Sequence, residues 1–212
     1  MRDIVDISKI YNSYYESENY RIEKYILTHD LYNIYSLKDD KNYPLGLMYR
    51  DEDAQNIGKE IVSLVHKKHG CIMSSNAHEI FSCKSFIDQA YGDVLNFGLG
   101  LGIIIFPLLN DPIVKSIKII ESDEDLIKMI SPLIKLRDYN NKVSIIHGDA
   151  FTFHKNLQEK FDTIFFDIWP ILDINALKDM EYLHTVYAKN LKTEKSLMTS
   201  WCYDEIKKYF NS

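Results

Sequence analysis

The chain has 212 residues, and its 46% hydrophobic content is enough for the core of one main domain with an additional module. Its 25 basic and 31 acidic residues give a net charge of −6, which disfavours sequence-independent binding to a nucleic-acid backbone. The three cysteines are widely spaced, and no apolar run approaches the about 18 residues that span a membrane. We therefore expect a cytoplasmic protein with no membrane partner, for which nucleic acid is a disfavoured but not an excluded partner.

The first part of the chain mixes helix-like and strand-like patterns. Apolar residues at near-helical spacing predict a short amphipathic helix within residues 1–20. Short apolar runs separated by polar turns predict a small antiparallel sheet between residues 20 and 50. Two further helices are predicted. The first covers residues 51–69 and ends at Gly70, and the second covers residues 76–90.

From residue 91 onwards, strand-like and helix-like segments alternate. Buried strands, with helices between them, are predicted over residues 94–97, 117–120, 143–146, 161–166 and 196–199. Pro132 is expected to divide the helix after the second of these strands into two pieces. Such alternation is typical of an α/β fold, a Rossmann-like and mostly parallel sheet with helices on both faces. We predict two units, a leader over residues 1–90 and a Rossmann-like domain over residues 91–212.

A glycine-rich turn follows the first predicted strand of this domain. Gly98, Gly100 and Gly102 stand at alternate positions behind the apolar run of residues 94–97. Glycine permits a positive φ and lets the backbone approach a ligand closely. A helix that starts behind such a turn offers free N–H groups to an electron-rich group. The pattern is a weak signal alone, so its meaning depends on the other strand ends.

Acidic residues follow the next three predicted strands. Glu121 comes after the second strand, where a carboxylate can accept hydrogen bonds from the two hydroxyls of a ribose. Asp149 follows the third strand, where it can accept from an adenine amino group. Asp167 follows the fourth strand and precedes Trp169. Because the carboxyl ends of parallel strands meet at one edge of a sheet, we expect these residues to line one ligand site.

The glycine spacing distinguishes two kinds of nucleotide site. A dinucleotide site needs G-x-G-x-x-G, whose last glycine would fall at Ile103. The observed Gly-x-Gly-x-Gly, with an acid after the second strand and an Asp after the third, instead resembles class I S-adenosylmethionine-dependent methyltransferases, over roughly residues 92–170. The stretches IIESDED, HGDAF and FDTIFFDIWP are similar to the spermidine synthase branch of that superfamily.

This resemblance implies a cofactor site and an acceptor site. S-adenosylmethionine, or its decarboxylated form, would be bound by residues at the first three strand ends: Asn96, Gly98, Gly100, Gly102, Glu121, Ser122, Asp149 and Ala150. Asp167 would be the catalytic residue, as a general base or by positioning the acceptor, and would bind the substrate together with Trp169. Asn96 departs from the family pattern, which has an acid there, so it cannot form an ion pair with the cofactor's amino group.

Three functions remain open as hypotheses. The first is methyl transfer from S-adenosylmethionine to an unidentified small-molecule acceptor. The second is aminopropyl transfer from the decarboxylated cofactor. Aminopropyltransferases carry Asp-x-x-Asp after the fourth strand, whereas here Pro170 stands three residues after Asp167, and Asp173 would have to fold back to supply the second acid. The third is a non-catalytic nucleoside-binding or interaction protein, which an open pocket beside Asp167 would count against.

Two sets of possible metal ligands lack an established zinc spacing. They are His66 and His69 with Cys71, and separately His78 with Cys83. We therefore expect no metal site.

The end of the chain predicts an incomplete sheet. Class I domains finish with an antiparallel hairpin after the fifth strand, and little chain remains beyond Thr199. A bare edge of this kind is a natural place for a homodimer to form. Tyr49 and Asp51 are candidates for a lid over the site.

Overall fold

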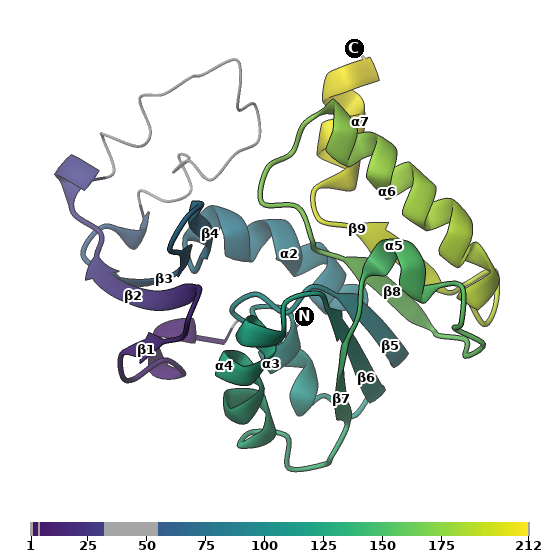
Figure 1. The fold of residues 1–212 in the computed structure, drawn as a ribbon, viewed down its shortest axis with the longest axis horizontal. Helices are drawn as coiled ribbons and strands as arrows, with labels where there is room; N and C mark the ends of the chain where they lie inside the picture. Colours follow the sequence, from purple (N-terminus) through teal and green to yellow (C-terminus); the bar gives the residue numbers. More distant parts are fainter. Residues whose placement is uncertain (1, 4, 32–54, 212) are drawn as a thin grey trace.

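The computed structural model describes residues 2, 3, 5–31 and 55–211, and every structural statement below concerns these residues. It contains two β-sheets that lie beside one another, with helix α2 (Ala77–Gln89) leading from the first to the second (Figure 1). Among these residues, no helix combines the length and hydropathy that crossing a bilayer requires. Most of the sheet predicted between residues 20 and 50, and the lid candidates Tyr49 and Asp51, lie outside the described residues.

The first sheet is antiparallel and four-stranded, in the order β1-β2-β3-β4. Its strands are β1 (Tyr15–Glu16), β2 (Tyr20–Ile26), β3 (Glu60–His66) and β4 (Gly70–Ser74). The sheet is antiparallel as predicted, but β2 is its only described strand within residues 20–50, and β3 and β4 lie further along the chain. The preceding segment has only one turn of 3-10 helix, η1 (Ile7–Lys9), so the amphipathic helix predicted within residues 1–20 is wrong.

The helix predicted over residues 51–69 is also wrong where the structure describes it. Five consecutive residues, Ile61 to Val65, are buried in β3, which pairs with β2 on one side and β4 on the other. A central strand covered on both faces produces a continuous apolar run, which can also be read as the buried side of a helix. Gly70, predicted as the end of that helix, instead begins β4 with a φ of +82°.

The second sheet is five-stranded and entirely parallel, in the order β7-β6-β5-β8-β9. Its strands are β5 (Gly92–Phe97), β6 (Val114–Glu121), β7 (Val143–His147), β8 (Thr163–Phe166) and β9 (Leu197–Ser200). The helices after α2 are α3 (Ile105–Leu109), α4 (Glu124–Lys135), α5 (Ala150–Phe153), α6 (Ile174–Tyr187), η3 (Ala188–Asn190) and α7 (Tyr203–Asn211). The predicted α/β Rossmann-like fold is thus confirmed.

Helix α4 does not break at its proline. It runs from Glu124 to Lys135 with Pro132 inside, so the predicted division into two helices is wrong. The buried side chains Ile130 and Ile134 lie on either side of Pro132 in sequence and pack into the same core. We infer that this shared burial outweighs the hydrogen bond that proline cannot donate.

The edge strand β9 agrees with the short sheet expected from the sequence. It pairs with β8 in parallel, and no antiparallel hairpin follows it within the described residues. The homodimer suggested for such an edge stays a prediction.

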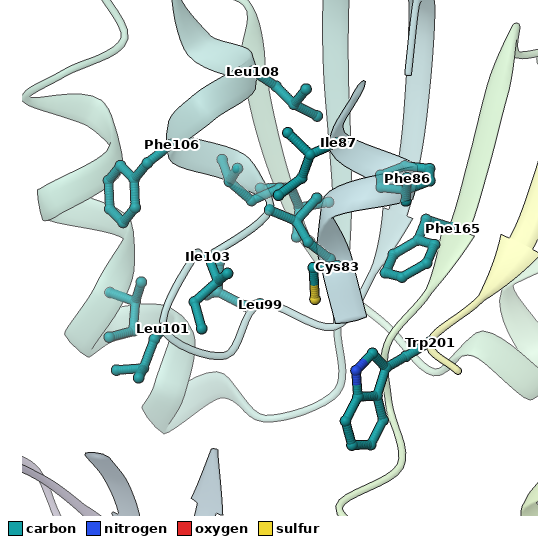
Figure 2. Packing of buried hydrophobic residues seen from close by; sticks show 14 of the residues in the cluster. Cys83, Phe86, Ile87, Leu99, Leu101, Ile103, Phe106, Leu108, Phe165 and Trp201 are labelled. Atoms are coloured by element: carbon teal, nitrogen blue, oxygen red, sulfur yellow. The ribbon is translucent and has the colours of Figure 1, made fainter. Parts of the chain in front are cut away.

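One hydrophobic cluster joins the two sheets. It includes Ile22 and Leu64 from the first sheet, Phe86 from α2, and Leu101 and Phe106 beyond β5. Figure 2 shows α2 side chains packed against the segment that follows β5 and against Phe165 of β8. The division of the chain near residue 90 stays a prediction, although residues on both sides of it share this core.

Polar contacts reinforce the same junction. The hydroxyl of Tyr11, a fully buried residue, donates to the carbonyl of Leu101 at 2.8 Å. The guanidinium of Arg2 pairs with Asp111 and donates to the carbonyls of Ile87 and Ala90. The N-terminal segment is therefore fastened to both α2 and the parallel sheet.

Candidate active site

A cavity of about 830 Å³ lies at the carboxyl ends of the central parallel strands. Residues of β3, β4 and α2 cover it, so both sheets contribute to its walls. Its lining includes all the predicted site residues except Asn96 and Gly102: Gly98, Gly100, Glu121, Ser122, Asp149, Ala150, Asp167 and Trp169. The structure thus brings residues from four successive strand ends to one place.

The glycine turn is shaped by the protein groups packed against it. A Cβ atom at Gly98 would lie 2.0 Å from the carbonyl oxygen of Asp167, and one at Gly100 would lie 2.6 Å from the sulfur of Met73. Both glycines also have positive φ, at 92° and 48°. Glycine is therefore required here because the end of β8 and strand β4 approach the turn closely.

Asn96 and Gly102 support this turn from outside the cavity lining. Asn96 is 2% exposed, and its side-chain N–H donates to the carbonyl of Gly98 at 2.6 Å. The Gly102 carbonyl accepts hydrogen bonds from the N–H groups of Ile105 and Phe106, at the start of α3. We therefore drop both residues from the set proposed to contact the cofactor directly.

Glu121 is held in place by backbone donors. One carboxylate oxygen accepts the N–H of Leu99 at 2.8 Å, and the other accepts the N–H of Asp123 at 2.9 Å. Burial raises its pKa, and these hydrogen bonds act in the opposite direction because they favour the ionised form. The result is a fixed carboxylate at the end of β6, directly beside the glycine turn.

The end of β7 contributes a capped helix start. The side chain of Asp149 accepts the N–H of Phe151 at 2.9 Å and so caps the short helix α5. Asp149 is exposed at the cavity rim, whereas Ala150 is buried. Ser122 lies next to Glu121, and its carbonyl is 2.9 Å from the ring Nε2 of His147. These residues form the wall on the β6–β7 side.

Asp167 occupies a different environment at the end of β8. Its backbone N–H donates to the carbonyl of Phe97, but within the described residues its carboxylate has no hydrogen-bond partner. Burial, and then the charge of Glu121, raise its pKa to about 7. A carboxyl group with this pKa can exchange a proton near neutral pH, as general acid–base chemistry requires.

The segment after Asp167 does not bring a second acid into the cavity. Asp173 is exposed and caps α6, accepting the N–H groups of Asn175 and Ala176 at 2.9 and 2.8 Å. The indole of Trp169 lines the cavity and lies 3.5 Å from an Asp179 oxygen, a long contact. The folded-back Asp173 that aminopropyl transfer would favour is therefore not present.

Sequence reasoning missed the wall formed by residues distant in the chain. Tyr20 of β2, Met73 of β4, Glu79 of α2 and Trp201 after β9 all line the cavity. The Tyr20 hydroxyl donates to Asp123 at 2.8 Å, and the Trp201 indole donates to Ser82 at 2.7 Å. Of these residues, only Glu79 has a sequence pattern that could have pointed to it, an acid in the first turn of a helix. Such an acid is usually interpreted as stabilising the helix start.

The cavity is strongly acidic. Five carboxylates line it, those of Glu79, Glu121, Asp123, Asp149 and Asp167, and the part of the lining that the structure describes includes no lysine or arginine. Such a lining attracts a cation and repels an anion.

The fold and the site define a Rossmann-like α/β protein with a ligand-sized acidic cavity at its strand ends. A family model described as the spermine/spermidine synthase domain matches residues 75–198, more than half of the chain. The chain therefore belongs to the spermine/spermidine synthase domain family, in agreement with the resemblance seen in its motifs. No curated protein sequence matches the chain.

The chain is also similar to solved structures, at low sequence identity. The methyltransferase PaMTH1 of Podospora anserina, bound to SAH, is 20% identical over 61% of this chain and 53% of its own, with a TM-score of 0.46. The spermidine synthase of Thermotoga maritima is 15% identical over 63% of this chain and 49% of its own, with a TM-score of 0.41. The chain spans about half the length of these structures, and at these identities the likeness does not extend to a reaction or substrate.

Proposed function

We propose that this protein is a transferase that moves a group from the sulfonium of S-adenosylmethionine, or of its decarboxylated form, to a small acceptor. The observation that carries the proposal is Asp167, which lines a cavity with the residues of three other strand ends and has a pKa of about 7. An open cavity beside Asp167 also counts against a purely non-catalytic protein.

The donor set at the end of β6 fits the nucleoside. A carboxylate offers about four lone-pair positions, and the backbone N–H groups of Leu99 and Asp123 take one on each oxygen of Glu121. The Ser122 hydroxyl donates a longer hydrogen bond, of 3.4 Å, to the oxygen that Asp123 already contacts. The acceptor capacity that remains, greatest on the oxygen bonded to Leu99, would serve the hydroxyls of a ribose. The rim residue Asp149 and the buried Ala150 would border the adenine, and the chain attached to the sulfur would pass the turn of Gly98 and Gly100.

The protein's own groups would then position the acceptor and receive its proton. When bound, the cofactor supplies an electrophilic carbon on its sulfonium sulfur. Substitution at such a carbon is in line, so holding the acceptor beside it supplies much of the rate. Asp167, ionised in about half of the molecules near pH 7, would accept the proton that the acceptor loses.

Methyl transfer is the finer assignment that we propose. The Asp-x-x-Asp pattern of aminopropyltransferases is interrupted by Pro170, and Asp173 is used to cap a helix outside the cavity. Asp167 is then the one acid at the end of β8, and it is sufficient for a methyl acceptor that loses a single proton.

Aminopropyl transfer is the second candidate, and two observations favour it. The chain belongs to the spermine/spermidine synthase domain family. In addition, the described lining offers carboxylates but no lysine or arginine to pair with the carboxylate of S-adenosylmethionine, which the decarboxylated form lacks.

Calorimetric titration with each cofactor, followed by mass spectrometry of a mixture of small amines and other acceptors, tests these proposals. Binding of S-adenosylmethionine and an acceptor heavier by one methyl group would support the first. Preference for the decarboxylated cofactor and a product heavier by one aminopropyl group would support the second. If neither cofactor binds, both transferase proposals fail and the non-catalytic hypothesis gains support.

A further inference from the structure

We propose that Glu79 binds the ammonium group of the cofactor and so replaces the acid that the glycine motif lacks. The proposal rests on the proposed function, because it concerns the same cavity. It applies equally to S-adenosylmethionine and to its decarboxylated form, since both carry an ammonium group on the chain attached to the sulfur.

Strand β5 cannot supply the missing carboxylate. Position 96 carries an asparagine whose N–H is directed at the Gly98 carbonyl, and this residue does not line the cavity. An ammonium group near the glycine turn therefore needs an acceptor from another element.

Glu79 meets this requirement by its position. It is 4% exposed but lines the cavity, in the first turn of α2. The side chain of Asn76 caps this helix by accepting the backbone N–H of Glu79 at 2.7 Å. The cap fixes the backbone of Glu79 at the edge of the cavity before a ligand arrives.

The start of α2 is held against the glycine turn. Met73, which precedes α2, accepts the N–H of Leu101 with its sulfur at 3.3 Å, and the same sulfur limits position 100 to glycine. One turn after Glu79, Cys83 packs in the same cluster as Leu99 (Figure 2). The segment that packs against the glycine turn therefore leads directly into the helix that carries Glu79.

The neighbouring thiol indicates that Glu79 and Asp167 face the same region. The pKa of Cys83 is raised first by its burial, then by the charge of Asp167 and then by that of Glu79. Asp167 stands at the end of β8, beside Gly98, while Glu79 lies on the α2 side. This arrangement leaves Asp167 for the acceptor and assigns the Glu79 carboxylate, on the α2 side of the cavity, to the cofactor.

The test compares ligands that differ in the ammonium group. S-adenosylmethionine and decarboxylated S-adenosylmethionine both carry it, whereas 5′-methylthioadenosine has the same nucleoside without it. Calorimetry on Glu79→Gln should show about a tenfold or greater loss of affinity for the first two ligands and a change of less than about threefold for 5′-methylthioadenosine. The matched control is Glu124→Gln, an exposed acid outside the cavity lining, which should change none of the three affinities.

Two results would overturn the assignment while leaving the proposed function intact. One is an unchanged affinity of Glu79→Gln for all three ligands, and the other is an equal loss for all three. If circular dichroism shows that Glu79→Gln does not fold, Glu79→Asp replaces it. Its shorter carboxylate should weaken the two ammonium ligands more than 5′-methylthioadenosine, and equal effects would again overturn the assignment. Failure of the wild-type protein to bind any of the three would instead overturn the proposed function, and this inference with it.

Discussion

Glu121 and Asp167 end the two strands that flank β5, yet their surroundings differ. Backbone N–H groups bind both oxygens of Glu121, whereas none of the described residues donates to the carboxylate of Asp167. Burial raises the pKa of both groups, and it brings the pKa of Asp167 to about 7 together with the charge of Glu121. The same functional group can therefore serve as a fixed hydrogen-bond acceptor at one strand end and as an exchangeable proton site at the other.

The largest expected effect is on turnover when Asp167 loses its charge. Asp167→Asn keeps the shape but cannot accept a proton, so we expect kcat to fall by about 10²–10⁴-fold. Cofactor affinity, measured by calorimetry, should change by less than about threefold. A large loss of cofactor binding would show that the two carboxylates do not divide binding and chemistry between them.

The next effect is on cofactor affinity when Glu121 is changed. Glu121→Gln retains one oxygen acceptor but loses the charged hydrogen bonds, so we expect the Kd to rise by roughly tenfold to a hundredfold. Glu124→Gln, three residues further along the chain and outside the cavity lining, is the control. An affinity equal to that of the wild type would remove Glu121 from the proposed binding site.

The pH dependence of the rate should report Asp167. Because its pKa is raised to about 7, the ionised form that accepts a proton becomes populated as the pH rises through 7. With saturating cofactor, kcat should therefore rise by about tenfold between roughly pH 6 and 8 and then level off. A rate that is flat over this interval would argue that Asp167 only positions the acceptor.

The smallest expected effect is on stability, which should fall as the pH rises, whereas the rate should increase. The pKa of Asp167 is raised in the folded state, so the unfolded chain loses this proton at a lower pH than the folded protein does. The free energy of unfolding therefore falls as the pH rises from about 4 to about 7. Asp167→Asn removes this penalty, so its Tm should exceed that of the wild type by roughly 2–4 °C at pH 8 and by less at pH 5. Calorimetric melting at both values checks the trend, which a pH-independent difference would contradict.

The sequence predicted the parallel sheet well because each strand is a short apolar run that ends in a polar residue. The strand ends of a parallel sheet converge, so the sequence alone predicts that Glu121, Asp149 and Asp167 lie together, as they do in the cavity lining. In contrast, the run of Ile61 to Val65 predicts a helix, because burial on both faces removes the alternation that marks a strand.

The missed parts of the site depend on long-range packing. Tyr20 and Glu79 reach the cavity only because the first sheet and α2 fold over the parallel strands. This long-range packing is not encoded in local spacing.

The core that joins the two sheets also has a consequence for synthesis on the ribosome. Ile7, Tyr11 and Ile22 are made early, but the residues that bury them include Leu101 and Phe106, which are made much later. The early segment therefore emerges with apolar surface whose native burial is completed only about 80 residues later, after roughly 4–16 seconds of elongation. A nascent chain halted before the glycine turn is expected to recruit holding chaperones, and one extended beyond α3 should release them.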